Sequence, residues 1–171
     1  IIGRPYRDVM LAAAMPAGFT IDVVGAVVGA SDDVMLDLLD DALAAQVVRE
    51  RTGHDGTYEF VHALIRQTLY GELATPRRVR LHRRVLDALE LVFAKRIEEH
   101  LAELAYHAYQ AAPGGDVAKA VDYARRAGDA AMERTAYEEA ARSYEMALLA
   151  LEHGARGEES RPPELLFCLG R

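Results

Sequence analysis

The side chains best suited to chemistry lie in one short segment, from Phe60 to Tyr70. Within it, His62, Arg66 and Tyr70 recur at every fourth residue, so that on a helix they would form a ridge of neighbouring polar side chains. An imidazole and a guanidinium can both donate hydrogen bonds to a phosphate or a carboxylate on another surface. The same spacing also fits a solvated helix flank that binds nothing, and the segment alone leaves both interpretations open.

A row of apolar residues should hold this ridge helix against the protein. The row consists of Val61, Leu64, Ile65 and Leu69. Residues at these intervals share one face of a helix, and we expect that face to be buried. We therefore expect His62 and Arg66 at the surface without a strong internal partner, and Tyr70 along the same flank.

Composition limits the classes of function. The 171 residues are 51% hydrophobic, which suffices for one or two modest cores, and no apolar run approaches the roughly 20 residues of a membrane span. The net charge of −7 argues against general affinity for nucleic acids. A single cysteine, Cys168, excludes an internal disulfide and indicates a reducing, cytoplasmic setting. We expect the chain to be part of a longer protein, because it lacks an initial Met and ends in a new apolar run.

The first 74 residues predict a winged-helix domain. The expected order is three helices and one β-hairpin, with helices at 5–14, at 21–29 and after Ser31 or Asp32, and strands at about 47–50 and 57–61. Thr20 is a candidate N-cap for the second helix. The ridge helix should follow the hairpin directly and end near Leu73.

Residues 75–97 predict a basic connecting helix, with Thr75 as its N-cap and Pro76 at its first position. Arg77, Arg80 and Arg84 fall on one face of it. This face could be merely solvated, or it could dock on an acidic partner surface. A nucleic-acid contact is less favoured because no aromatic residues alternate with the arginines.

Residues 98–171 predict an α-solenoid of tetratricopeptide-like repeats that is cut short by the end of the chain. Ala-rich helices are expected at about 98–112, 116–133 and 137–152, with a polar insert at 153–161. Small and aromatic residues match the packing positions of the tetratricopeptide frame, namely Gly128, Ala131, Tyr137, Ala140, Tyr144 and Ala147. Such residues let antiparallel helices stack closely.

Other activities find little support in the sequence. In a DNA-binding winged helix the third helix enters the major groove, yet that region carries five carboxylates and no Lys or Arg before Arg49. The carboxylates belong to Asp32, Asp33, Asp37, Asp40 and Asp41. His100, Glu103 and His107 share a helix face, but their spacing is wider than metal-binding helices use, so we expect no metal site. No phosphate loop or nucleophile elbow is present, and we expect no catalytic residues.

The order of these segments resembles a known class of bacterial protein. The Phe60–Tyr70 segment precedes Arg77-Arg78 and Leu81–Arg84, and then come Leu101–His107 and Ala136–Ala141. This order is similar to the region after the nucleotide-binding module in STAND-class signalling ATPases, which include LuxR-type transcriptional regulators. The resemblance spans about residues 8–152.

The resemblance implies a regulatory, non-catalytic region whose winged helix packs on an ATPase core in the same parent protein. It implies that His62 approaches the diphosphate of bound ADP, with Arg66 one turn further along, and that the repeats bind a protein or peptide. ATP and ADP would be ligands of the parent protein, and this chain would hold no cofactor itself. The stretch Met15–Phe19 departs from the family's Ile-Gly-Arg-Glu-Phe-like pattern, so the contacts of that loop are not carried over.

Two other functions stay open on the sequence. The chain could be a stand-alone tetratricopeptide adaptor that binds a peptide or protein in its groove. A DNA-binding winged-helix regulator is the less favoured choice, because of the aspartates.

Overall fold

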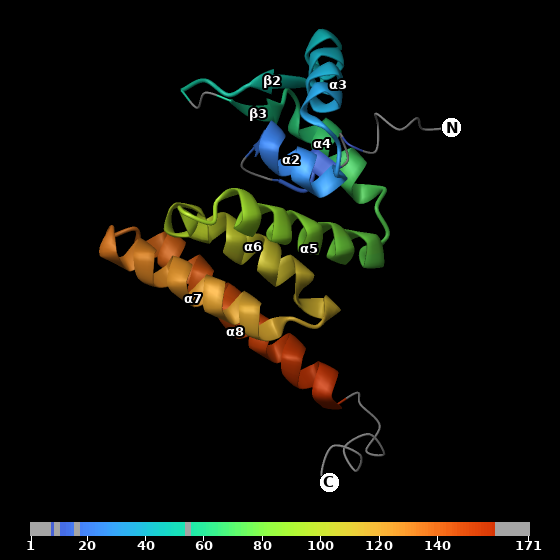
Figure 1. Ribbon diagram of the computed structural model, residues 1–171. Coiled ribbons are helices and arrows are strands. Elements are labelled where there is room, and N and C mark those ends of the chain that lie inside the picture. The colour runs from blue at the N-terminus through green and yellow to red at the C-terminus, as the bar shows by residue number, and fades with distance from the viewer. Residues whose placement is uncertain (1–7, 9–10, 16–17, 54–55, 160–171) are drawn as a thin grey trace. The chain divides into compact units, whose positions relative to one another are not determined.

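The computed structural model of the chain describes residues 8, 11–15, 18–53 and 56–159 (Figure 1). These residues are mainly helical and include one small antiparallel sheet. The chain divides into two compact units, Ile1–Glu99 and His100–Arg171. The range 75–97, expected to form a connecting helix, therefore lies entirely in the first unit. Half of the first expected helix, at 5–14, lies outside the described residues, and among the rest residues 8, 11 and 12 are helical.

The first unit consists of three short strands and four helices among its described residues. In chain order they are β1 (Phe19–Thr20), α2 (Ile21–Val28), α3 (Asp32–Ala44), β2 (Val48–Glu50), β3 (Thr57–Phe60), α4 (Ala63–Gly71) and α5 (Thr75–Val92). Thr20 caps α2 as expected, because its side-chain oxygen accepts a hydrogen bond from the backbone N–H of Val23. Gly29 ends α2 in the left-handed conformation, with φ of 70°.

The sheet has a strand that the sequence analysis did not predict. We expected a two-stranded hairpin, whereas β1 adds a third strand and the order is β1-β3-β2. Phe19 pairs with Tyr58, and Val48 pairs with Phe60. A strand of two residues is too short to show alternation, and its second residue already serves as a helix cap, so the pattern gave no signal. Gly18 makes the pairing possible, because its φ is 99° and a Cβ there would lie 2.9 Å from the carbonyl oxygen of Tyr58.

The core of the first unit lies largely between α2 and α5, which pack together. Both helices contribute side chains that are at most 5% exposed, among them Val23, Val24 and Val27 of α2 and Leu81, Val85 and Leu89 of α5. Burial of such side chains is worth about 2 kcal/mol each. Thr75 was expected to be the N-cap of α5, but Ala74 occupies that position and Thr75 is helical. The error is one residue, within the usual uncertainty of helix ends.

The ridge helix, α4, is shorter than expected and buries fewer residues. Leu69 is 3% exposed and lies in the core, but Val61 and Ile65 are half-buried and Leu64 is 72% exposed. The expectation of a fully buried stripe is therefore wrong, most clearly at Leu64. Spacing identifies residues that share a helix face, but it does not show how far along the helix that face is covered.

The second unit is a succession of helices, α6 (Leu101–Ala111), α7 (Val117–Glu133) and α8 (Tyr137–Glu159), in which each packs against the next. Asp116 caps α7 through a hydrogen bond from the backbone N–H of Lys119. Alanines form much of the interface, including the fully buried Ala120, Ala124 and Ala150. Such small side chains allow the helix backbones to approach closely.

The last helix contradicts one expectation. The polar insert at 153–161 was expected to interrupt the helices, but α8 continues without a break to Glu159. Two glycines in this stretch cost about 1 kcal/mol each in helix propensity, which a helix that is already packed can absorb. No proline lies between Tyr137 and Pro162, so no residue of this kind forces the helix to end earlier.

Candidate functional site

His62 stands at the point where the sheet gives way to the ridge helix. Strand β3 ends at Phe60, α4 begins at Ala63, and His62 is the N-cap residue, with extended backbone angles and no capping hydrogen bond from its side chain. His62 is exposed and Arg66 is half-buried. Within the described parts of the chain, neither side chain makes a hydrogen bond or an ion pair. Both are therefore available to a ligand from outside the unit.

Tyr70, the third member of the expected ridge, is directed into the unit. Its hydroxyl lies 2.8 Å from Nε2 of His82 on α5, and the two rings meet edge-on with centroids 5.8 Å apart. His82 is 0% exposed, and burial, with a smaller contribution from the Arg78 charge, lowers the pKa of its imidazole to about 4. A neutral imidazole carries one N–H, so it joins the Tyr70 hydroxyl in one hydrogen bond, in which the tautomer decides the donor.

Arg78 completes the contact between α4 and α5. Its guanidinium lies 5.3 Å from the centre of the Tyr70 ring, and its Nε donates to the carbonyl oxygen of Leu73 at 2.7 Å. Burial raises the pKa of the Tyr70 hydroxyl, although the Arg78 charge opposes this shift. We call Tyr70, Arg78 and His82 the Tyr70–His82 latch. It holds the end of α4 in place while His62, at the start of α4, stays at the surface.

The three arginines of the expected docking surface do not behave alike. Arg77 and Arg80 are exposed and, among the described residues, make no hydrogen bond or ion pair. The guanidinium of Arg84 instead donates to the carbonyl oxygen of Val27, the next-to-last residue of α2. A cation at a helix C-terminus satisfies a terminal carbonyl and complements the helix dipole. Arg84 therefore holds α2 and α5 together, and only Arg77 and Arg80 are available to a partner.

Helix α3 carries its negative charge on the surface. The five aspartates between Asp32 and Asp41 are all exposed, and α3 contains no Lys or Arg. Val34 and Leu36 are each 49% exposed on the same helix. A duplex approaching this surface would meet carboxylates with no compensating cation on the helix.

The side chains of His100, Glu103 and His107 lie in different surroundings. His100 Nδ1 lies 3.7 Å from a Glu103 carboxylate oxygen, while His107 is 0% exposed. Burial raises the pKa of the Glu103 carboxyl to about 7. In the described part of the chain, no group of three or more His, Cys, Asp or Glu side chains is placed to hold a metal ion. No pattern in the sequence indicates that Glu103 is half-buried, because the residues three and four positions away from it along the chain are polar.

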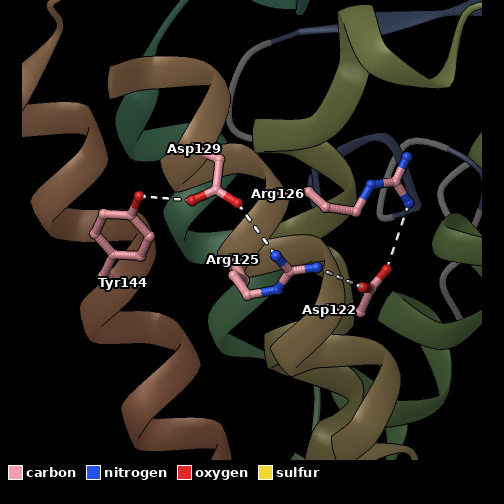
Figure 2. Close-up of polar contacts among 5 residues, drawn as sticks. All are labelled: Asp122, Arg125, Arg126, Asp129 and Tyr144. Atoms are coloured by element: carbon pink, nitrogen blue, oxygen red, sulfur yellow. Dashed lines mark hydrogen bonds and ion pairs between the residues drawn. The ribbon is translucent and has the colours of Figure 1, made fainter. Parts of the chain in front are cut away.

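Polar contacts on the surface of α7 extend to α8 (Figure 2). The hydroxyl of Tyr144 donates to Asp129 at 2.8 Å, and Arg125 bonds the other oxygen of Asp129 at 3.3 Å. Asp122 forms ion pairs with both Arg125 and Arg126. These residues are exposed or half-buried, so each ion pair contributes at most about 1 kcal/mol. The arginines of α7 are thus engaged with acids of their own helix, a pairing that their four-residue spacing indicates.

Beneath this network, the Tyr144 ring fills the space left by Gly128. A Cβ at Gly128 would lie 2.5 Å from the ring, closer than any real contact. The aromatic ring of α8 therefore packs directly on the backbone of α7. This contact joins two of the residues that the sequence frame singled out.

Comparison of the chain with protein-family models, with curated proteins and with solved structures finds no match. The described helices include none that is both long enough and apolar enough to cross a membrane.

Proposed function

We propose that this chain is a regulatory, non-catalytic region of a bacterial STAND-type ATPase of the transcriptional-regulator kind. In this proposal the first unit docks on a nucleotide-binding core in the same parent protein, and the second unit binds a protein or peptide. One observation carries the proposal. His62 is exposed at the start of α4, while the Tyr70–His82 latch fixes the other end of the same helix.

The topology of the first unit supports a winged-helix domain. Strand β1 precedes α2, the hairpin of β2 and β3 follows α3, and β3 lies between the other two strands. A short strand that joins the hairpin in this way is typical of winged helices. The acidic surface of α3 makes this domain unsuited to a DNA duplex, so its use would be contact with protein.

The chemistry of the exposed end of α4 suits a diphosphate. The imidazole of His62 can donate one hydrogen bond to a phosphate oxygen, and Arg66 can add a charge-assisted, two-pronged contact. Both side chains are unengaged within the described residues, so neither contact would require an internal bond to break first. The residues that cradle the phosphates would come from the core, because this chain has no phosphate loop. The nucleotide role of His62 is thus one that it would perform only in the parent protein.

A second candidate function is a stand-alone tetratricopeptide-like adaptor. The contact of Tyr144 with Gly128 supports it, because a ring packed on a glycine of the preceding helix is what the repeat frame requires at these positions. This contact also fits the leading proposal, in which repeats follow the winged helix. The two candidates differ in what precedes the first unit in the parent protein.

Reading the residues encoded upstream of Ile1 separates these candidates. The leading proposal expects a Gly-x-x-x-x-Gly-Lys-Ser/Thr phosphate loop within roughly 300 residues, the size of one large domain or two small ones. If no such loop is encoded there, the leading proposal is wrong and the adaptor takes its place.

A further inference from the structure

Helix α8 exposes a row of large apolar side chains along one face. Tyr137 and Leu148 are each 64% exposed, and Leu151 is 53% exposed. Ala141 is exposed between them, and Tyr144 is half-buried on the same line. A helix exposes single apolar residues routinely, but a continuous row on one face is characteristic of a contact surface.

The spacing within this row is regular. From Tyr137 the members follow at intervals of four, three, four and three residues. This is the heptad pattern by which two helices pack side by side, with each member of the row inserting into a hole formed by four side chains of the partner. The row spans about 21 Å, at 1.5 Å of rise per residue. We call Tyr137, Ala141, Tyr144, Leu148 and Leu151 the α8 heptad face.

An acidic row borders this face. Glu138, Glu145 and Glu152 are exposed and recur at intervals of seven residues, each directly after a member of the heptad face. The opposite border consists of Ala140 and Ala147, which are buried. The face is therefore acidic along one edge only, and the charges of a partner helix can be matched to that edge.

We propose that the α8 heptad face docks a helix of another protein that has apolar residues in the same four-three spacing and Lys or Arg along one edge. The inference rests on the part of the proposed function that gives the second unit a protein ligand, and it specifies the surface and the chemistry of that ligand. A second copy of this chain fits less well. Pairing two α8 helices antiparallel would bring the glutamates of both copies together, and like charges at such positions are destabilising.

Two synthetic peptides of about 21 residues, long enough to form helices, provide the probe. Both carry Leu in the four-three spacing, and they differ only in having Lys or Glu along one edge. Each peptide is labelled and titrated with the whole 171-residue chain at low salt, and fluorescence anisotropy reports binding. We expect the Lys peptide to bind at least about tenfold more tightly than the Glu peptide, with the difference shrinking as salt is added.

Substitutions in the chain locate the binding surface. Leu148→Asp should weaken binding of the Lys peptide at least about tenfold, because the substitution places a charge in the centre of the contact. Leu91→Asp is the matched control, since Leu91 is also largely exposed, at 73%, but lies on α5. The pair Glu138→Lys and Glu145→Lys should reverse the preference, so that the Glu peptide binds more tightly. This reversal tests the face even if Leu148→Asp perturbs folding.

The outcomes separate this inference from the function on which it rests. If neither peptide binds, both the inference and the protein-ligand role of the second unit lose their support. If the Lys peptide binds but Leu148→Asp and the glutamate reversal change nothing, the ligand binds elsewhere and only the inference is wrong. The inference is also wrong if sedimentation shows a dimer that Leu148→Asp dissociates, because a second copy of the chain would then occupy the face. It is equally wrong if the Lys peptide binds only after residues 160–171 are removed, because the chain itself would then occupy the face.

Discussion

The hydroxyl of Tyr70 and Nε2 of the buried His82 share a hydrogen bond of 2.8 Å, which ties α4 to α5. This contact divides the ridge of three polar side chains into two parts with different roles. Tyr70 stabilises the fold, whereas the exposed His62 and the half-buried Arg66 make no hydrogen bond or ion pair among the described residues. His62 and Arg66 are therefore carried by a helix whose position is set by the core.

Replacing Tyr70 by Phe tests the latch. The substitution keeps the ring and removes the hydroxyl, so we expect the free energy of unfolding to fall by about 1–2 kcal/mol. Urea denaturation measures the change. Tyr137→Phe is the control, because Tyr137 is 64% exposed and its hydroxyl makes no hydrogen bond among the described residues. A loss no larger than that of the control would mean that the hydrogen bond to His82 does not stabilise the unit.

The buried imidazole of His82 predicts a loss of stability in acid. Its pKa is about 4 in the folded chain and 6.5 in the unfolded one, so the unfolded chain binds more protons between these values. With respect to this imidazole, the free energy of unfolding is highest above pH 6.5. It falls by up to about 3 kcal/mol as the pH falls toward 4. The measurement is the free energy of unfolding across this range in the Glu103→Gln variant, which removes an opposing titration. A flat profile in that variant would contradict the burial of His82.

Glu103 predicts the opposite pH dependence. Its pKa of about 7, raised from 4.5 by burial, means that the folded chain retains a proton that the unfolded chain releases. The carboxyl therefore costs stability progressively as the pH rises from 4.5 to 7. We expect Glu103→Gln to leave stability unchanged at pH 4 and to raise it by about 1–2 kcal/mol at pH 8, allowing for the partial exposure of the side chain. If Glu103→Gln raised the free energy of unfolding by the same amount at pH 4 and at pH 8, burial of the carboxyl would not be the cause of the increase.

Gly128→Ala tests the packing of Tyr144 on α7. Alanine favours helix by up to about 1 kcal/mol, but its Cβ would displace the Tyr144 ring, and overpacking costs about 1–3 kcal/mol. We expect net destabilisation in thermal melts. Gly71→Ala is the control, because a Cβ at this helical glycine meets nothing within 4 Å and should stabilise slightly. If both substitutions stabilise the chain, the close approach of the ring to Gly128 is incorrect.

Local signals in the sequence predicted those features of the fold that depend on local interactions. Thr20 caps α2 because a hydroxyl beside free backbone N–H groups needs no distant partner. The paired strands β2 and β3 and the start of α8 at Tyr137 likewise fall where they were expected. Exposure of His62 also agreed with expectation, since a polar residue beside an apolar face has few internal partners to find.

Features that depend on distant contacts were missed or wrong. Leu64 belongs to the same apolar row of α4 as the buried Leu69. It is nevertheless exposed, because the tertiary packing of α4 does not cover it. Arg84 shares a helix face with Arg77 and Arg80, but its partner is Val27, far away in the sequence. The partnership of Tyr70 with His82 could not be predicted either, because it depends on how α4 and α5 cross. Such pairings arise from the fold, and spacing along one helix does not encode them.

If His62 contacts a nucleotide diphosphate in the parent protein, the affinity of that protein for ADP depends on the imidazole. His62→Ala should weaken ADP binding at least about tenfold, the loss of one charge-assisted hydrogen bond. The same substitution should change the free energy of unfolding of the 171-residue chain by less than about 1 kcal/mol, because His62 is exposed. His153→Ala, at another exposed histidine, is the control and should leave both quantities unchanged. Equal affinity for ADP in the wild type and in His62→Ala would contradict the account.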